Sequence, residues 1–390
     1  LDPLRIIQEL ERKLKVTINI KTDLLVFDEI QACPKAITSL KYFCEDMPEL
    51  ALASAGSLLG VKYGEASFPV GKVDLINMFP MTFTEFLLGL DENEKHEIVD
   101  AWQWGQRIPE FMHKELFDLW KQYLVVGGLP EIVSGYNQLK LNQIDALMIT
   151  REKQSEIINI YMADMAKHCG SVNAMHIERV FSNIPEQLAR RLDANAPKFT
   201  FKNVVPKIKG YDQLSGAIDW LRASNLIIKV LIANHGQQPL KAYTEENRFK
   251  LFLYDVGILG ALGNLDPLAM MDYNYGTYKG YMGENFIAQE FSHELGRNDQ
   301  LYAWEENKSE VEFIRTIAGK QIPIEVKSGF NTRARSIDVF AKKYDSPYKI
   351  IFSANKFSYD SNRKVCKLPI YLAKACSVIV ANKDILGHQN

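Results

Sequence analysis

Leu24-Leu25-Val26-Phe27-Asp28-Glu29 is the stretch that decides the fold, because four apolar residues are followed directly by two acids. A short apolar run closed by polar residues predicts a buried β-strand, here with two carboxylates at its carboxyl end. Pro34 then begins a predicted helix, and residues 50–55 form a second apolar run that ends at Gly56-Ser57. A strand, a helix and a strand at this spacing form a βαβ unit, so we predict a parallel sheet.

The two acids suit a site that hydrolyses ATP with Mg²⁺, and the run has the form of a Walker B strand. Asp28 would hold the Mg²⁺ shell, and Glu29 would orient or deprotonate the attacking water. Ser57, at the end of the neighbouring strand, would sense the γ-phosphate. Taken alone, Asp-Glu after an apolar run is also an ordinary helix start, and Ser57 an ordinary turn residue, so the pattern depends on its context.

Residues near 95–165 are predicted to be mainly helical, with a break at Gly127-Gly128-Leu129-Pro130. Asp2-Pro3 has the residues of a helix start. A strand is predicted at 73–76, before a capped helix that begins near Thr82. Residues 170–235 show three helical patterns and then the apolar run 226–232. This order fits a winged-helix module or a plain helical lid, and the sequence does not separate the two.

The last part of the chain shows a change of pattern. After a helix at 283–295, residues 310–314 and 321–327 alternate in polarity around Ala318-Gly319, which is typical of a β-hairpin. Glu325 and Lys327 are two apart on one predicted strand and therefore share a face. A strand at 348–353 and a late strand at 377–380 are also predicted.

Several motifs occur in a fixed order along nearly the whole chain. They are Leu25–Gln31, Ala55-Gly56-Ser57, Phe68–Val73, Phe79–Leu87, Gly127–Glu131, Phe249–Gly257 and Gly283-Glu284-Asn285. In this order they resemble the AAA-like prokaryotic ATPases that carry a C-terminal domain of unknown function with a restriction-endonuclease-like fold.

The resemblance implies an α/β protein. A P-loop NTPase parallel sheet lacking its N-terminal part is followed by a helical or winged-helix middle region and an α/β restriction-endonuclease-like C-terminal domain. The predicted domains are an ATPase core at 1–90, a helical lid at 91–165, a winged-helix-like linker at 166–275 and the nuclease-like domain at 276–390.

The phosphate-binding part of the predicted ATPase core is missing from these residues. A Gly-x-x-x-x-Gly-Lys-Ser/Thr loop is expected upstream of Asp28, but the first glycine of the sequence is Gly56. The chain also begins at Leu1 without an initiator Met, so we expect an N-terminal segment to be lacking; the alternative is a family member that has lost the loop. Lys72 stands where the resemblance often has an arginine that acts on the γ-phosphate, and lysine lacks the planar fork of arginine.

The C-terminal acids resemble the acid, then acid-x-Lys pattern of PD-(D/E)xK nucleases. The resemblance assigns Glu284, Glu312 and Glu325 to metal binding and Lys327 to stabilising charge or positioning water. Glu312 stands where the pattern usually has Asp, and its extra methylene weakens the nuclease interpretation. Alternating charges on an exposed sheet face are the other interpretation.

Composition restricts the classes of protein. The formal net charge is -2, so a surface that binds nucleic acid would have to be local. Residues 331–390 are a candidate, because they contain eleven Lys and Arg and only four Asp. No apolar stretch is long enough to cross a membrane. The five cysteines are scattered without metal-site spacing, which indicates reduced thiols and a cytoplasmic protein. Trp102-x-Trp104 could stack bases, although such aromatic residues are more often core.

Three functions follow from these patterns. The first is an ATPase whose hydrolysis moves the C-terminal domain, and we favour it. The second is a DNA-processing enzyme in which the ATPase gates a nuclease. The third is a nucleotide-dependent switch, or a nucleic-acid-binding protein with an inactive nuclease fold, and this one allows a protein partner or a homo-oligomer.

Overall fold

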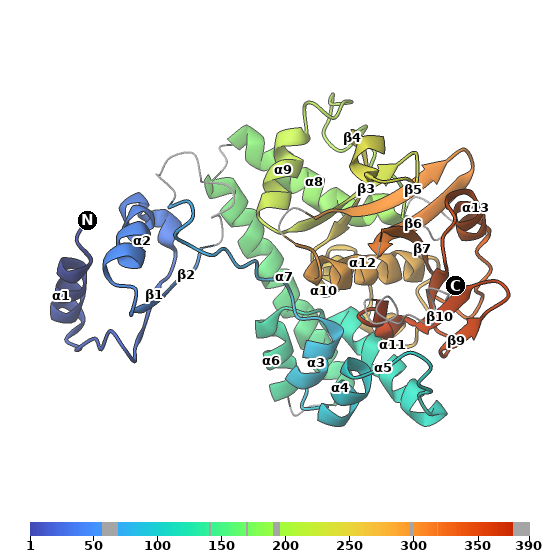
Figure 1. Cartoon of the computed structure of the whole chain (residues 1–390), viewed down its shortest axis with the longest axis horizontal. Coiled ribbons are helices and arrows are strands. Elements are labelled where there is room, and N and C mark those ends of the chain that lie inside the picture. The colour runs from blue at the N-terminus through green and yellow to red at the C-terminus, as the bar shows by residue number, and fades with distance from the viewer. Residues whose placement is uncertain are drawn as a thin grey trace. The chain divides into compact units, whose positions relative to one another are not determined.

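The computed structural model describes residues 1–56, 69–139, 142–168, 171–189, 196–296, 299–317 and 319–376. The chain divides into two compact units (Figure 1). The first contains residues 1–78 and 219–226, and the second contains residues 79–218 and 227–390.

The first unit contains the predicted βαβ arrangement. Its elements are α1 (Pro3–Leu14), β1 (Leu24–Phe27), the short 3₁₀ helix η1 (Ile30–Ala32), α2 (Pro34–Asp46) and β2 (Ala51–Ser54). β1 and β2 pair in parallel, with Leu24 opposite Ala51 and Phe27 opposite Ser54, so the predicted parallel sheet is confirmed. Asp2 caps α1 as predicted, because its side chain accepts from the Leu4 N–H at 3.0 Å.

The prediction that these strands are buried is wrong for one of their faces. Leu25, Phe27 and Leu52 pack against apolar side chains of α1 and α2, but Leu24 and Val26 are 61% and 55% exposed. The described helices of this unit pack on a single face of the pair, so alternate residues stay outside. Residues 73–76 form no strand, although the sequence predicts one.

Helices dominate the first half of the second unit. They are α3 (Phe83–Gly89), α4 (Asn93–Asp100), α5 (Glu110–Val126), α6 (Pro130–Gln138), α7 (Gln143–His168) and α8 (Ser171–Ala189). Thr82 and Glu85 form a reciprocal capping box at the start of α3. The predicted break at Gly127-Gly128 is confirmed, and Gly127 has a φ of +78°. A Cβ there would lie 2.3 Å from Asp255 Oδ1, so glycine lets the chain pass this buried carboxyl. No described helix is long and apolar enough to span a membrane.

A mixed sheet organises the second half of this unit (Figure 1). Its order is β4-β3-β5-β6-β7-β8-β10-β9. The strands are β3 (Ile227–Ala233), β4 (Thr244–Leu253), β5 (Leu301–Glu306), β6 (Ser309–Ile317), β7 (Lys320–Val326), β8 (Lys349–Ser353), β9 (Ser358–Asp360) and β10 (Val365–Pro369). The predicted hairpin is confirmed as β6 and β7, while β9 and β10 were not predicted. The late strand predicted at 377–380 lies outside the described residues.

The apolar run at 226–232 becomes β3, which follows α9 (Ser215–Ala223) and pairs with both β4 and β5. The β3–β4 hairpin therefore belongs to the same sheet as the later strands. Two shorter helices follow β4, namely α10 (Val256–Leu262) and α11 (Pro267–Met271). The 3₁₀ helix η2 (Leu240–Tyr243) precedes β4, and the 3₁₀ helix η3 (Ile370–Leu372) follows β10. Helices α12 (Tyr278–His293) and α13 (Arg335–Tyr344) both contact β7, and residues 321–326 are buried throughout.

Glu290 on α12 is a buried carboxyl that joins α12 to the start of α3. It accepts the Phe83 N–H at 2.8 Å and is 5% exposed. Burial raises the pKa of Glu290 to about 8, although the Phe83 N–H acts in the opposite direction. Glu294 and Glu85 raise it further, and Lys374 lowers it.

We predict that Glu290→Gln removes a pH dependence of stability. Between the ordinary glutamate pKa and about 8, the folded protein holds a proton that the unfolded chain has released. Stability therefore falls as the pH rises through this window. Since a pKa unit corresponds to about 1.4 kcal/mol, the wild type should lose on the order of 2–4 kcal/mol more than Glu290→Gln between about pH 5 and 8. Urea unfolding at several pH values measures this.

The matched control is Glu97→Gln, which changes an exposed carboxyl on α4. It should follow the wild type at every pH. Parallel pH profiles for the wild type and Glu290→Gln would contradict the assignment.

Candidate active sites

The predicted ATPase acids lie at the carboxyl end of β1, where the chain turns toward η1. The Ile30 N–H donates to Ala55 O at 3.0 Å, and the Ala55 N–H donates to Phe27 O at 2.9 Å. These bonds hold the ends of β1 and β2 side by side. Two exposed carboxylates, Asp28 and Glu29, follow directly.

The local backbone sets how these two acids are presented. Glu29 has a φ of +49°, a left-handed conformation that is uncommon outside glycine. Asp28 Oδ1 accepts the Glu29 N–H at 3.0 Å, which steadies the turn. Gln31 Nε2 donates to Glu29 Oε2. Both acids therefore belong to a turn whose conformation is held by hydrogen bonds.

The residues that were predicted to accompany these acids are placed only in part. Ser57 lies outside the described residues, so its role as γ-phosphate sensor stays a prediction. Lys72 Nζ lies 3.1 Å from Glu45 Oε1 on α2, and its ammonium is therefore already paired. A Mg²⁺ ion in a nucleotide site takes one or two carboxylates, and the nucleotide phosphates and water supply its other ligands. Asp28 and Glu29 fit this requirement because both are exposed oxygen donors.

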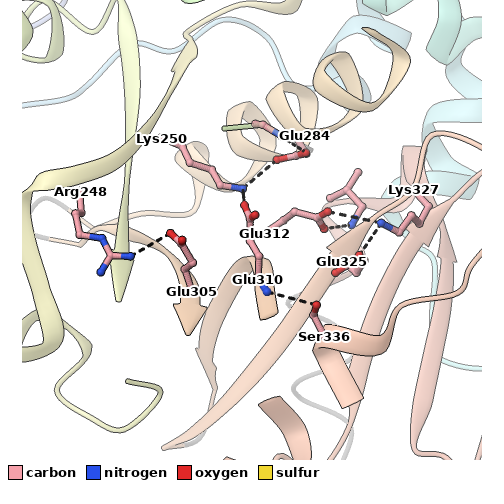
Figure 2. A network of polar contacts seen from close by, with 11 residues as sticks. Arg248, Lys250, Glu284, Glu305, Glu310, Glu312, Glu325, Lys327 and Ser336 are labelled. Carbon is pink, nitrogen blue, oxygen red and sulfur yellow. Dashed lines mark hydrogen bonds and ion pairs between the residues drawn. The ribbon is translucent and has the colours of Figure 1, made fainter. Parts of the chain in front are cut away.

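The second candidate site lies among β4, α12, β6 and β7 (Figure 2). It brings together all four residues that were predicted from the nuclease resemblance, namely Glu284, Glu312, Glu325 and Lys327. Two further residues complete this glutamate–lysine cluster, Lys250 on β4 and Glu310 on β6.

Each lysine of the cluster binds two carboxylates. Lys250 Nζ lies 2.7 Å from Glu310 Oε1 and 3.4 Å from Glu284 Oε2. Lys327 Nζ lies 2.6 Å from Glu325 Oε1 and 3.8 Å from Glu312 Oε1. The side chains of Lys250 and Glu284 are each 1% exposed, so this pair is desolvated.

Backbone amides engage two of the acids. Glu284 Oε1 accepts the Ala196 N–H at 2.7 Å, and Glu312 Oε2 accepts the Val326 N–H at 2.6 Å. Each bond takes up a carboxylate oxygen that could otherwise bind a metal. Within the described chain, Glu312 Oε1 and Glu325 Oε2 are buried and have no hydrogen-bond partner.

The electrostatics of the cluster favour protons on some of its carboxyls. If every group were ionised, four carboxylates would face two ammonium groups in a buried place. Burial raises the pKa of Glu284 to about 7 against the opposing effect of Lys250. Burial and the neighbouring Glu325 raise the pKa of Glu312 well above its ordinary value. Burial also raises the pKa of Glu325, against Lys327.

The lysine pKa values move in the complementary direction. Burial alone would lower the pKa of Lys250, but Glu284, Glu310 and Glu312 together raise it above its ordinary value. The same balance, with Glu312 and Glu325 as the main carboxyls, raises the pKa of Lys327. Both lysines therefore remain charged at neutral pH and neutralise the acids around them.

The cluster does not fit a metal ion. No group of three or more His, Cys, Asp or Glu side chains in the described part of the chain is arranged to hold one. Lysine ammonium groups sit against the acids, and the amides of Ala196 and Val326 occupy further oxygens. We therefore derive no metal-dependent step from this site.

Lys250 and Glu310 are the members of the cluster that were not among the predicted site residues. Lys250 stands inside the apolar run Phe249–Leu253. A lysine in the middle of an apolar strand is itself a signal, because a buried ammonium group requires partners. Its partners come from α12 and β6, which are distant in sequence and were not identifiable from the strand alone.

Comparison with known proteins agrees with part of this description. Residues 2–87 match a family described as an AAA domain. Residues 117–269 match a domain of unknown function (DUF8612), and residues 279–371 match another (DUF4143). No curated protein matches the chain. The AAA match supports the AAA-like class predicted for residues 2–87, whereas the endonuclease-like class is not established for the C-terminal region.

One solved structure is similar, a Walker-type ATPase of Pyrococcus abyssi. It has 15% sequence identity and a TM-score of 0.38, and the match covers 66% of this chain and 66% of that one. The chain thus corresponds to slightly less than two thirds of the length of that protein. The likeness is too low to support a fold assignment.

We predict that Lys250→Met destabilises the second unit by about 3–5 kcal/mol. The substitution keeps a long apolar side chain but leaves Glu284 and Glu310 without their ammonium partner. The urea unfolding transition of the full chain measures the change. The double variant Lys250→Met/Glu284→Gln should recover part of the loss, because it removes one of the two unpaired charges.

Lys308→Met, at an exposed turn between β5 and β6, is the matched control and should change stability by less than about 0.5 kcal/mol. Equal effects of the two single variants would show that Lys250 does not neutralise the cluster.

Proposed function

We propose that the protein is a Mg²⁺-dependent ATPase whose hydrolysis site includes Asp28 and Glu29. The observation that carries this proposal is the AAA-domain match over residues 2–87, which contains β1, both acids and the parallel neighbour β2. Asp28 would hold the Mg²⁺ shell, and Glu29 would orient or deprotonate the attacking water. Ser57, three residues after the end of β2 in the sequence, would sense the γ-phosphate.

The bonds between the strand ends support these roles. The Ile30 N–H donates to Ala55 O, and the Ala55 N–H donates to Phe27 O. The turn that carries the acids and the segment that leads toward Ser57 therefore leave the same edge of the sheet. ATP bound at this edge would meet both acids. The 390 residues contain no Gly-x-x-x-x-Gly-Lys-Ser/Thr sequence, so we assign no phosphate-cradling residue within them.

We predict that Glu29→Gln lowers the kcat for ATP by about 100-fold or more and changes the Kd for ATP by only a few fold. A glutamine keeps the size of the side chain but does not take a proton from water, and general-base assistance contributes at least about this factor. ATP turnover and nucleotide binding should be measured separately on the full-length gene product.

Glu49→Gln is the matched control. Glu49 is an exposed acid that precedes β2, at the amino end of the strand pair, whereas Asp28 and Glu29 lie at the carboxyl end. It should retain full turnover. Normal turnover by Glu29→Gln would remove Glu29 from the mechanism.

A second function is proposed for the second unit, which is to bind nucleic acid without cutting it. The observation that favours this over a nuclease is the neutralisation of the glutamate acids by Lys250 and Lys327. The excess of Lys and Arg after residue 331 supplies positive charge for phosphate contacts. A docked protein partner or a second copy of the chain is the alternative use of this unit.

We expect DNA incubated with the protein and Mg²⁺ or Mn²⁺ to stay intact, while binding weakens steeply as salt rises. Cleavage assays on gels and anisotropy titrations at several salt concentrations test the two parts separately. Cleavage that Glu325→Gln abolishes would establish the nuclease instead. No binding at low salt would leave a protein partner.

A further inference from the structure

A pocket of about 580 Å³ opens between the segment before α5 and the strands β9 and β10. Its lining includes four aromatic and two basic side chains: Trp104, Phe357, Tyr359, Tyr371, Arg107 and Lys356. All of them belong to the second unit. None belongs to the glutamate–lysine cluster or to the proposed ATP site. The volume lies within the range of about 300–1,000 Å³ that is usual for sites that bind small ligands.

The aromatic residues form a connected wall. The ring centroid of Trp104 lies 5.2 Å from that of Phe357 and 5.1 Å from that of Tyr359, both edge to face. Trp104 is half-buried and Tyr359 is 37% exposed, so parts of their surfaces remain accessible. This wall brings together residues more than 250 positions apart in the sequence.

Trp102 packs behind the wall. It is 1% exposed, packs against Phe357 with ring centroids 5.3 Å apart, and donates from Nε1 to Gln106 O at 3.1 Å. These contacts fix the segment that carries Trp104 and Arg107. Of the two tryptophans in the Trp-x-Trp motif, one therefore belongs to the core and the other faces the pocket.

The two cations of the pocket differ in their pairing. Lys356 forms an ion pair with Glu110 at the start of α5. Arg107 is exposed and forms no ion pair with any residue that the structure describes. A guanidinium group offers several donors in one plane, which suits a phosphate group. Arg107 is thus the group at this wall that is best placed to meet an anion.

We propose that this pocket binds a nucleotide unit, with the base against the Trp104 and Tyr359 rings and a phosphate at Arg107. An apolar ligand would leave the guanidinium without an anion, and an inorganic anion would leave the aromatic wall unused. A base with its phosphate uses both, as in single-strand binding sites where bases stack on aromatic rings beside cations. The nucleotide unit comes from single-stranded nucleic acid or from a free mononucleotide.

The pocket is separate from the proposed ATP site, and it would be one place where the second unit binds nucleic acid. Binding is therefore tested without Mg²⁺ and without ATP. Fluorescein-labelled oligothymidylate of twelve nucleotides is titrated with the full chain in EDTA, and thymidine monophosphate serves as competitor. Trp104→Ala, Trp104→Phe and Arg107→Glu are compared with Lys308→Glu, which makes the same charge change at an exposed residue outside the pocket.

We expect Trp104→Ala and Arg107→Glu each to weaken binding about 10-fold or more, while Trp104→Phe keeps most of it because it keeps a ring. Lys308→Glu should bind like the wild type. Displacement by thymidine monophosphate at a concentration near its own Kd identifies a site for free nucleotides, and its failure to compete identifies a site for single strands.

The proposal is overturned if neither probe binds, or if oligothymidylate binds Trp104→Ala and Arg107→Glu as tightly as the wild type. In the latter case the nucleic acid is held elsewhere, so the second proposed function survives and the pocket does not. Circular dichroism and the Tm confirm that each variant is folded. Arg107→Glu changes an exposed side chain and provides the result if Trp104→Ala is unstable.

Discussion

A lysine ammonium group buried inside an apolar strand must be neutralised, and in this protein that requirement connects four elements of the second unit. Lys250 on β4 binds Glu284 on α12 and Glu310 on β6. On the neighbouring side, Glu312 on β6 accepts the Val326 N–H of β7 and faces Lys327. None of these charges is stable alone in a desolvated place, so the helix and the strands are held in one relative arrangement.

The same constraint gives the two groups of acids different surroundings. Asp28 and Glu29 are exposed at the end of a strand pair, where a magnesium ion and a nucleotide could reach them. The acids of the glutamate–lysine cluster lie against lysines, and no group of three or more His, Cys, Asp or Glu side chains among the described residues is arranged to hold a metal. Acids that resemble each other in sequence pattern therefore differ in the chemistry that their surroundings permit. The difference lies in burial and in the cation beside each carboxylate.

Local signals were interpreted correctly wherever neighbouring residues make the contact. The Asp2 cap, the Thr82 and Glu85 capping box and the β6–β7 hairpin depend on residues close together in the sequence. The parallel pairing of β1 with β2 needs only the single helical crossover between them. The burial of a strand is harder to predict from the sequence, because it depends on which helices cover that strand. Leu24 and Val26 have the composition of a buried strand, yet the helices of their unit pack on the opposite face.

By itself, the sequence indicated the AAA-like character of residues 2–87, the order of most helices and strands, and the four residues of the acid-x-Lys pattern. These depend on residue types at fixed spacing, which the chain carries locally. Only the tertiary structure decided that Lys250 completes that pattern, that β3 and β4 belong to the C-terminal sheet, and that Trp104 faces a pocket while Trp102 does not. Each of these depends on contacts between distant segments, and local spacing carries no information about such contacts.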